Sequence, residues 1–327
     1  MKIAACYSSR ADYAPLYPVM SALKKRGAEV WHFSLDDVKV EDDTPYSCCL
    51  FLTKWMNRLA DRFSKSKPDL VLILGDRYEA LGSAQVATLF QIPIAHIHGG
   101  ETTEGSFDNE FRHAITQLAT YHFVSAERHA GLVAAMRGSP LNVHVVGAPG
   151  LDNISDLPLR EFPGKYFLVT YHPVTKGKSN GHLAIIEALK SFPEYGVVWT
   201  GVNNDPGRIE ILTSFQNTPG IMVVDDMEPK RYLSAMKYAA CCIGNSSSFL
   251  IEAPALGVAA VNVGDRQKGR LHGDSVLDAP EDASEISRII SIALNMPDKG
   301  VAPIFYRSPY GGPGASAKIA DILMGVA

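Results

Sequence analysis

The sequence of 327 residues predicts an α/β protein with two doubly wound domains, and three observations support this prediction. Short apolar runs alternate with helix-length amphipathic segments along most of the chain. The apolar runs, such as LVLIL at 70–74, lack polar alternation, which is typical of parallel sheets covered by helices on both faces. The alternation stops once, at a stretch holding three prolines, and then resumes. Two sheets therefore follow one another in the chain.

The first series of elements forms a predicted N-terminal domain over residues 1–150. Its apolar runs are at most five residues long, and a segment of helical periodicity follows each of them except the last. We predict strands at 2–6, 29–33, 70–74, 93–97, 122–124 and 143–146, and helices at 13–26, 50–65, 79–90, 109–118 and 126–136.

The proline-bearing stretch 151–163 is the predicted linker, and residues 164–310 form the predicted C-terminal domain. Segment 311–327 follows a Gly/Pro break and carries a helix that we expect to cross back to the first domain. The C-terminal domain is predicted to hold strands at 166–171, 197–200, 221–224, 239–243 and one ending at 263, and helices at 182–191, 208–215, 230–238, 249–256 and 283–294.

Composition excludes several classes of protein. The net charge is -4 and no basic block occurs, so nucleic acid is not an expected partner. The five cysteines form no CxxC pair, which suits reduced thiols in a reducing compartment. The N-terminus lacks the apolar run of a signal peptide, and no run approaches the roughly 18 residues of a membrane span. We therefore expect a soluble, cytoplasmic protein with no membrane partner.

The stretch 243–270 predicts a phosphate site in the second domain. Gly244 and Asn245 end a strand, and Ser246, Ser247 and Ser248 supply cap hydroxyls where a helix begins. A helix N-terminus favours phosphate, and Glu252, one turn further, could accept two hydrogen bonds from a ribose diol. An ordinary Ser-capped turn with a solvated Glu explains the same residues, so both interpretations stay open.

Polar residues also follow the strands of the first domain, at the edge where open α/β sheets bind ligands. Arg10 follows the first strand and suits a diphosphate. Asp76 and Arg77 follow LVLIL, where they either bind a ligand or form an ion pair or cap. Asp108 and Arg112 lie four residues apart and can pair on one helix face, which on its own is a structural arrangement.

Histidines provide candidate acid–base groups. By strand alternation His96 and His98 share one face, and Gly99-Gly100-Glu101 follows them. This pattern lacks a third ligand at a typical spacing, so we expect no metal. His172, before a proline in the second domain, is either an acid–base group or a packed side chain. Asn203 after the next strand either binds ligand or forms a turn.

Taken together, these stretches resemble the hydrolysing branch of the UDP-N-acetylglucosamine 2-epimerase family, and the resemblance covers nearly the whole chain. It rests on RADYAPLYPVM, GDRYEAL, HIHGGETTEGSFDNEFRHAIT, HPVT, GNSSSFLIEA, VGDRQKGR and SPYGGPGASAKI, in this order. The resemblance implies two Rossmann-like doubly wound domains facing across a cleft, as in the glycosyltransferase-B fold.

The family's chemistry removes UDP from C1 by elimination, with a base at C2, and then hydrates the glycal. It needs no cofactor and no metal. By matching position, the resemblance implies that Arg10, Ser246 and Ser247 bind the diphosphate, that Arg266 lies near the leaving group, and that Glu252 binds ribose. It assigns proton transfer to Asp76, Asp108 and His172, with Arg77 and Arg112 supporting the carboxylates. We also expect Arg77 and Asn203 to contact the UDP-sugar.

One position departs from the pattern of many members, which carry Glu where this chain has His98. Glu101 lies three residues on, so His98 and Glu101 are both candidate acid–base groups. The expected activity is release of UDP and N-acetylmannosamine from UDP-N-acetylglucosamine. The same reaction on UDP-2,4-diacetamido-2,4,6-trideoxyglucose and a glycosyltransferase of the same fold are the alternatives. We expect a homo-oligomer, a dimer or a tetramer.

Overall fold

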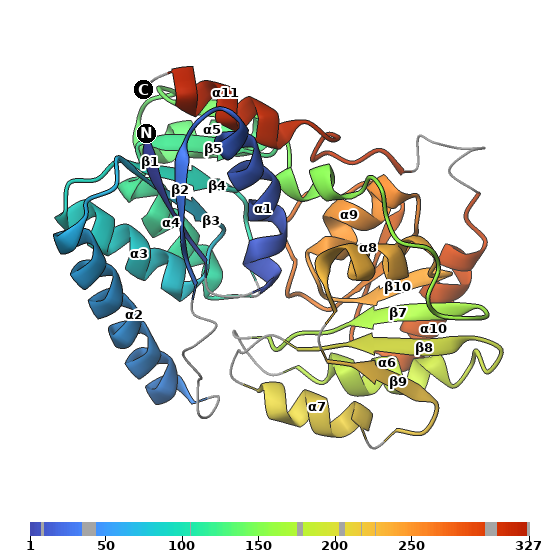
Figure 1. Cartoon of the computed structure of the whole chain (residues 1–327). Helices are drawn as coiled ribbons and strands as arrows, with labels where there is room; N and C mark the ends of the chain where they lie inside the picture. The colour runs from blue at the N-terminus through green and yellow to red at the C-terminus, as the bar shows by residue number, and fades with distance from the viewer. Residues whose placement is uncertain are drawn as a thin grey trace. The chain divides into compact units, whose positions relative to one another are not determined.

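The computed structural model describes residues 1–7, 10–34, 44–104, 106–174, 179–202, 207–216, 218–225, 227–297 and 306–325. They belong to two compact units (Figure 1). The first unit comprises Met1–Thr102, Phe107–Asn153 and Tyr310–Ala327, and the second comprises Thr103–Ser106 and Ile154–Pro309. Each unit contains one sheet of six strands, and every strand pair in both sheets is parallel.

The sheet of the first unit has the strand order β2-β1-β3-β4-β5-β6. From β1 the chain adds β2 on one side and β3 on the other, so the topological switch point lies between β1 and β3. The strands are β1 Lys2–Cys6, β2 Glu29–Phe33, β3 Leu70–Leu74, β4 Ile94–Ile97, β5 Tyr121–Val124 and β6 Val143–Val145. The helices are α1 Arg10–Lys25, α2 Pro45–Lys65, α3 Tyr78–Leu89, α4 Asp108–Leu118, α5 Glu127–Arg137, the 3-10 turn η1 Pro149–Asn153, and α11 Ala315–Gly325.

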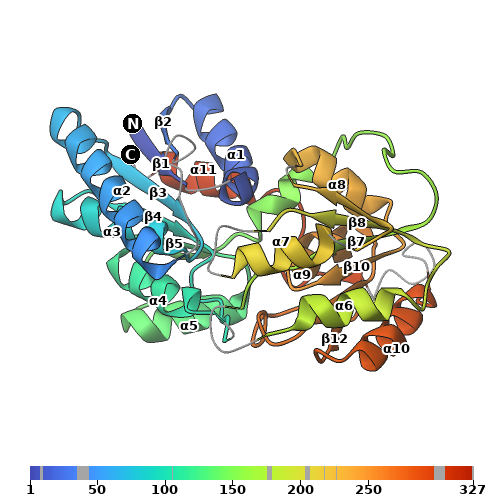
Figure 2. The same cartoon turned by 90° about the horizontal axis from the view of Figure 1, so that it is seen from below.

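Helices cover both faces of this sheet (Figure 2). Along β1, Ile3 and Ala5 pack with α1 and α11, whereas Ala4 and Cys6 pack with α2 and α3. Both faces of the strand are therefore apolar, which explains why the sequence shows no polar alternation there. The C-terminal α11 contributes Ile319, Ala320 and Leu323 to the core it shares with α1.

The second unit has the strand order β12-β11-β10-β7-β8-β9. Numbered within the unit, this is the order of dinucleotide-binding folds, with the switch point between β7 and β10. The strands are β7 Tyr166–Thr170, β8 Gly196–Thr200, β9 Ile221–Val224, β10 Cys241–Gly244, β11 Ala260–Val263 and β12 Val276–Ala279. The helices are α6 Gly181–Leu189, α7 Arg208–Gln216, α8 Pro229–Lys237, α9 Ser248–Leu256 and α10 Ala283–Leu294.

The two parallel, doubly wound sheets confirm the predicted fold class. Strand β12 was not predicted, because its two middle residues are only partly buried or exposed and include Asp278. In the part of the chain that the structure describes, no helix is long and apolar enough to cross a membrane.

Candidate active site

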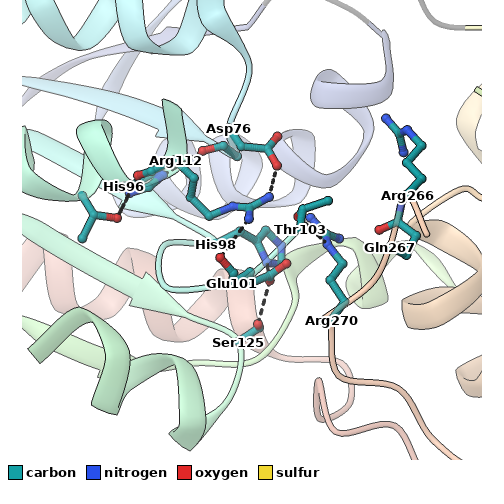
Figure 3. A network of polar contacts seen from close by, with 12 residues as sticks. Asp76, His96, His98, Glu101, Thr103, Arg112, Ser125, Arg266, Gln267 and Arg270 are labelled. Carbon is teal, nitrogen blue, oxygen red and sulfur yellow. Dashed lines mark hydrogen bonds and ion pairs between the residues drawn. The ribbon is translucent and has the colours of Figure 1, made fainter. Parts of the chain in front are cut away.

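The first group of site residues lies at the carboxyl ends of β3 and β4. Arg112, in α4, is fully buried. One of its terminal guanidinium nitrogens donates a hydrogen bond to the carboxylate of Asp76, which lies two residues after the end of β3 (Figure 3). Its other terminal nitrogen donates to the backbone carbonyl of Glu101 at 2.8 Å. One guanidinium therefore ties the loop after β3 to the loop after β4, and both loops carry predicted acid–base groups.

His98 and Glu101 form a second contact in the same loop. Nδ1 of His98 lies 2.6 Å from Oε1 of Glu101, and the Glu101 side chain is only 1% exposed. His98 has a φ of 65°, a left-handed conformation that is rare for a residue other than glycine. Such strained residues concentrate at functional sites, where the surrounding contacts hold them.

His96 has a structural role. Strand β4 ends at Ile97 and His98 has a positive φ, so the alternation that predicted a shared face does not extend to His98. The His96 ring is fully buried, and its Nε2 lies 2.8 Å from the carbonyl oxygen of Gly75. Burial lowers the pKa of His96 to about 4, so the ring is neutral at physiological pH and donates to that carbonyl. His96 thus supports the loop that carries Asp76.

The remaining predicted residues of this unit lie around that network. Arg77 forms an ion pair with Glu79 at 3.3 Å, and burial raises the pKa of the Glu79 carboxyl while Arg77 opposes the shift. Asp108 is the first residue of α4 and is partly buried. Arg10 is the first residue of α1, and its side chain lies outside the described part of the structure.

The second group of site residues lies at the switch point between β7 and β10. His172 follows β7 and is buried. Its backbone N–H donates to Oδ1 of Asn245 at 2.7 Å, and Nδ2 of Asn245 donates to the His172 carbonyl at 2.8 Å. Asn245 therefore acts as a two-point clamp that fixes the backbone of a predicted proton-transfer residue.

Arg266 and Gln267 converge on the same segment. The Arg266 guanidinium donates to the carbonyls of Pro173 at 3.2 Å and Asn245 at 3.3 Å, while Gln267 donates to Asn245 at 2.8 Å. Backbone carbonyls thus hold the buried Arg266, which the family resemblance places near the leaving group.

Helix α9 begins at Ser248, with Ser247 as its N-cap residue. The Ser247 hydroxyl makes no capping hydrogen bond, so the capping expected of this residue is wrong. Ser246 instead bonds Ser248 at 2.9 Å, and Ser248 bonds the Tyr232 hydroxyl at 2.6 Å. Burial raises the pKa of Tyr232, and the nearby charge of Glu252 adds to this shift. Asn203 lies outside the described residues.

Sequence reasoning missed two residues that organise these groups. Asn245 was interpreted only as a strand breaker, although an asparagine directly after a buried strand is a polar residue at the ligand-binding edge. Ser125 directly follows β5 and donates to Glu101 at 2.9 Å. The rule that singled out Asp76 and His98, a polar residue after a strand, applies equally to Ser125 and was not applied there.

The segment Thr103–Ser106 contacts the loop that follows β11. The Arg270 guanidinium lies 3.2 Å from the Thr103 hydroxyl, and the backbone N–H of Glu104 donates to the Lys268 carbonyl at 3.0 Å. The segment Thr103–Ser106, which connects β4 to α4 in sequence, therefore belongs to the second unit by its contacts. Over the described residues, no cluster of three or more His, Cys, Asp or Glu side chains is arranged to hold a metal ion.

Two Rossmann-like units in one chain, each with polar side chains after its parallel strands, define a protein of the glycosyltransferase-B-like class. The chain belongs to the UDP-N-acetylglucosamine 2-epimerase family, whose sequence profile matches residues 28–324.

Relatives and solved structures agree with this assignment. The chain is 35% identical to polysialic acid biosynthesis protein P7 of Escherichia coli, over 73% of this chain and 65% of that protein, so it spans about two thirds of that relative. It is 31% identical to the hydrolysing GDP/UDP-N,N'-diacetylbacillosamine 2-epimerase of Campylobacter jejuni, over 74% and 68% of the two chains. The UDP-GlcNAc 2-epimerase of Neisseria meningitidis, solved with UDP-GlcNAc, has the same fold, with a TM-score of 0.80, 18% identity and coverage of 99% and 100%.

Proposed function

We propose that the protein is a hydrolysing UDP-N-acetylglucosamine 2-epimerase, which converts its substrate and water to UDP and N-acetylmannosamine. The observation that carries the proposal is the network of Asp76, Arg112, Glu101 and His98 in a member of this family. The buried Arg112 binds the Asp76 carboxylate and the backbone of Glu101, whose carboxyl group contacts His98, so three titratable groups lie in one network after two parallel strands. A binding protein or a transferase needs no such set of proton-transfer groups.

The second unit supplies the nucleotide site in this proposal. The α9 N-terminus and Arg266 bind the diphosphate, Glu252 binds the ribose, and Ser246 and Ser247 contribute hydroxyls. The buried clamp by Asn245 supports the assignment, because it holds His172 and the Arg266 segment at the switch point where doubly wound sheets bind nucleotides.

The first unit supplies the acid–base groups. One base removes the C2 proton of the sugar, the C1–O bond breaks, and UDP leaves with the bonding electrons. Water then adds across the double bond, with its hydroxyl at C1 and a proton at C2 from the opposite face. Asp76, Asp108, His98 and Glu101 are the proposed proton-transfer residues of this unit, and Arg112 orients the carboxylates. His172 is a further proposed proton-transfer residue and belongs to the second unit.

Isotope labelling during turnover tests the proposed reaction. We expect UDP release without any acceptor, together with inverted free sugar carrying one deuterium at C2 when the solvent is deuterated water. In water enriched in heavy oxygen, the label should enter C1 of the sugar and not the UDP phosphate. Label in UDP, or retained protium at C2, contradicts the elimination. A requirement for a sugar acceptor identifies a glycosyltransferase instead.

The same assay identifies the sugar. Comparing kcat/KM for UDP-N-acetylglucosamine and its 2,4-diacetamido-trideoxy relative should favour the former by about 100-fold or more, which corresponds to roughly 2.7 kcal/mol of transition-state discrimination. A preference in the other direction reassigns the substrate but leaves the reaction unchanged. The oligomeric state and the location of the protein stay predictions, and light scattering of the purified protein measures the former.

A further inference from the structure

Below His98 and Glu101, two further side chains continue the hydrogen-bond chain into the core of the first unit. Ser125, after β5, donates its hydroxyl to Oε1 of Glu101 at 2.9 Å. Its oxygen also lies 2.9 Å from Nδ1 of His129 in the first turn of α5. Figure 3 shows the contact between Glu101 and Ser125. Ser125 and His129 are each 3% exposed, so the chain of hydrogen bonds runs from the loop after β4 into the interior.

The number of protons available fixes the direction of every bond in this chain. We take the Glu101 carboxyl group, which contacts both His98 and Ser125, as ionised; a carboxylate only accepts hydrogen bonds, so Nδ1 of His98 donates to it. Ser125 has a single hydroxyl proton, which it gives to Glu101. Nδ1 of His129 must therefore donate to the Ser125 oxygen. The chain has one consistent polarity, with both outer histidines donating toward the carboxylate.

The backbone holds this chain in place. Gly100 has a φ of 76°, and a Cβ atom there would lie 2.4 Å from the carbonyl oxygen of His129. The loop after β4 thus packs directly on the first turn of α5, and a larger residue cannot occupy this position without a shift. On its other side His129 faces the ring of Tyr310, with 6.1 Å between the ring centroids.

We infer that Ser125 and His129 are positioning residues that hold Glu101 and, through it, keep His98 in the tautomer protonated at Nδ1. In this tautomer Nε2 of His98 carries the lone pair, so the ring can accept a proton there and return it. The Glu101 carboxylate stabilises the imidazolium formed in between. The catalytic consequence rests on the proposed function, whereas the tautomer itself does not.

Magnetic resonance of the protein with isotope-labelled histidine tests the tautomer without any assay of activity. The His98 signals are identified by their loss in His98→Gln. We expect Nδ1 to carry the proton in the wild-type protein, and Ser125→Ala to shift the ring toward the Nε2–H form. A wild-type His98 protonated at Nε2, or a His98 spectrum unchanged by Ser125→Ala, overturns the inference even if the protein is the proposed epimerase.

Kinetics test the consequence for catalysis. Ser125→Ala should lower kcat by about 10-fold or more with little change in KM, because the lost hydrogen bond is to a charged group. Ser125→Thr keeps the hydroxyl and should recover most of the rate. His129→Asn, whose amide can replace the Nδ1 donor, should exceed His129→Leu in kcat. This second pair decides the question if Ser125→Ala does not fold.

Ser83→Ala is the matched control. Ser83 is equally buried in the same unit, and its hydroxyl donates to the Glu79 carbonyl and accepts from Trp55 outside the chain described above. It should lose stability without losing kcat. Equal kcat losses in Ser83→Ala and Ser125→Ala would show a general packing effect and overturn the positioning role. Wild-type protein with the expected tautomer but no turnover contradicts the proposed function alone.

Discussion

Arg112 is the buried positive charge at the centre of the network in the first unit. Its side chain is fully buried, and it binds both the Asp76 carboxylate and the Glu101 carbonyl. A buried guanidinium needs a partner, because an uncompensated buried charge is strongly destabilising. Asp76 is 20% exposed and can still reach a ligand. The ion pair therefore joins the buried guanidinium of Arg112 to a carboxylate that is partly exposed in the site.

Replacing Asp76 with Asn tests whether Asp76 transfers protons or only pairs with Arg112. Asp76→Asn keeps an oxygen for Arg112 but removes the counter-charge and the ionisable group, so we expect a loss of stability, and a fall in turnover of the folded protein by about 100-fold or more. UDP affinity should change little, because the proposed nucleotide site lies in the other unit. Steady-state kinetics and calorimetric titration with UDP measure the two effects. Asp61→Asn is the control, since Asp61 is an exposed partner of Lys65. Near-normal turnover of Asp76→Asn leaves this aspartate a purely structural partner of Arg112.

The limit of sequence-based prediction is visible at the same residues. Asp76 and His98 could be singled out because both follow apolar strands. The spacing of Asp108 and Arg112 predicted a pair on one helix, and the structure shows a bond from Arg112 to Asp76, 36 residues away, that was not predicted. Long-range partners of this kind depend on how elements pack, and a single sequence carries no local signal for them.

At the scale of elements, the paired ends of β7 and β10 leave no room for a side chain at Gly244. Gly244, the last residue of β10, has a φ of 141°, and a Cβ atom there would lie 2.0 Å from the carbonyl oxygen of Thr170. The close approach puts Asn245 within hydrogen-bond distance of His172. A glycine at the end of the strand is thus a requirement of the site as well as of the turn.

Gly244→Ala should therefore destabilise the protein by more than a positive φ alone explains. Gly220→Ala is the matched control, because Gly220 has a φ of 85° with nothing within 4 Å of its added Cβ. We expect about 1–2 kcal/mol for Gly220→Ala and more than about 3 kcal/mol for Gly244→Ala in urea unfolding. Similar costs for the two variants would falsify the close approach of β10 to β7.

Element types were predictable where both faces of a strand are buried, as in β3 and β7, because a continuous apolar run of that length has few other uses. Helix α2 was predicted to begin at residue 50 and begins at Pro45, where Thr44 caps it. Strand β12 escaped prediction because Asp278, one of its middle residues, breaks the apolar run, and the hydrogen bond that Asp278 accepts from Asn262 of β11 has no local sequence signal.

At the scale of the whole molecule, buried histidines contribute to the loss of stability in acid. Burial lowers the pKa values of His96 and His122 to about 4, whereas an unfolded chain titrates near 6.5. Between these values the unfolded chain binds more protons, so stability falls as the pH falls from 6.5 to 4. The contribution of His96 to this fall is roughly 3 kcal/mol. His272 has the opposite sign, because its hydrogen bond to Asp278 raises its pKa.

Urea unfolding from about pH 7.5 to about pH 3, which is about one unit beyond each end of the titration range, should show this difference in sign. His96→Gln should flatten the loss of stability between pH 6.5 and about 4. His272→Gln should instead cost more stability in acid than above neutral pH, because the charged histidine that favours the folded state is gone. A profile of His96→Gln that runs parallel to that of the wild type contradicts the assignment of the neutral, buried ring.

The division of the chain has a consequence for protein engineering. The first unit is interrupted by residues 154–309 and completed by Tyr310–Ala327, so the second unit, apart from Thr103–Ser106, is in effect an insertion into the first. The two ends of the interruption lie close together, because Ala148 donates to the Tyr310 carbonyl at 3.0 Å and Asp152 accepts from Ser316 at 2.8 Å. A short Gly/Ser bridge from Asn153 to Tyr310 could therefore replace the insertion, whereas simple truncation after Asn153 removes α11 and uncovers one face of the first sheet.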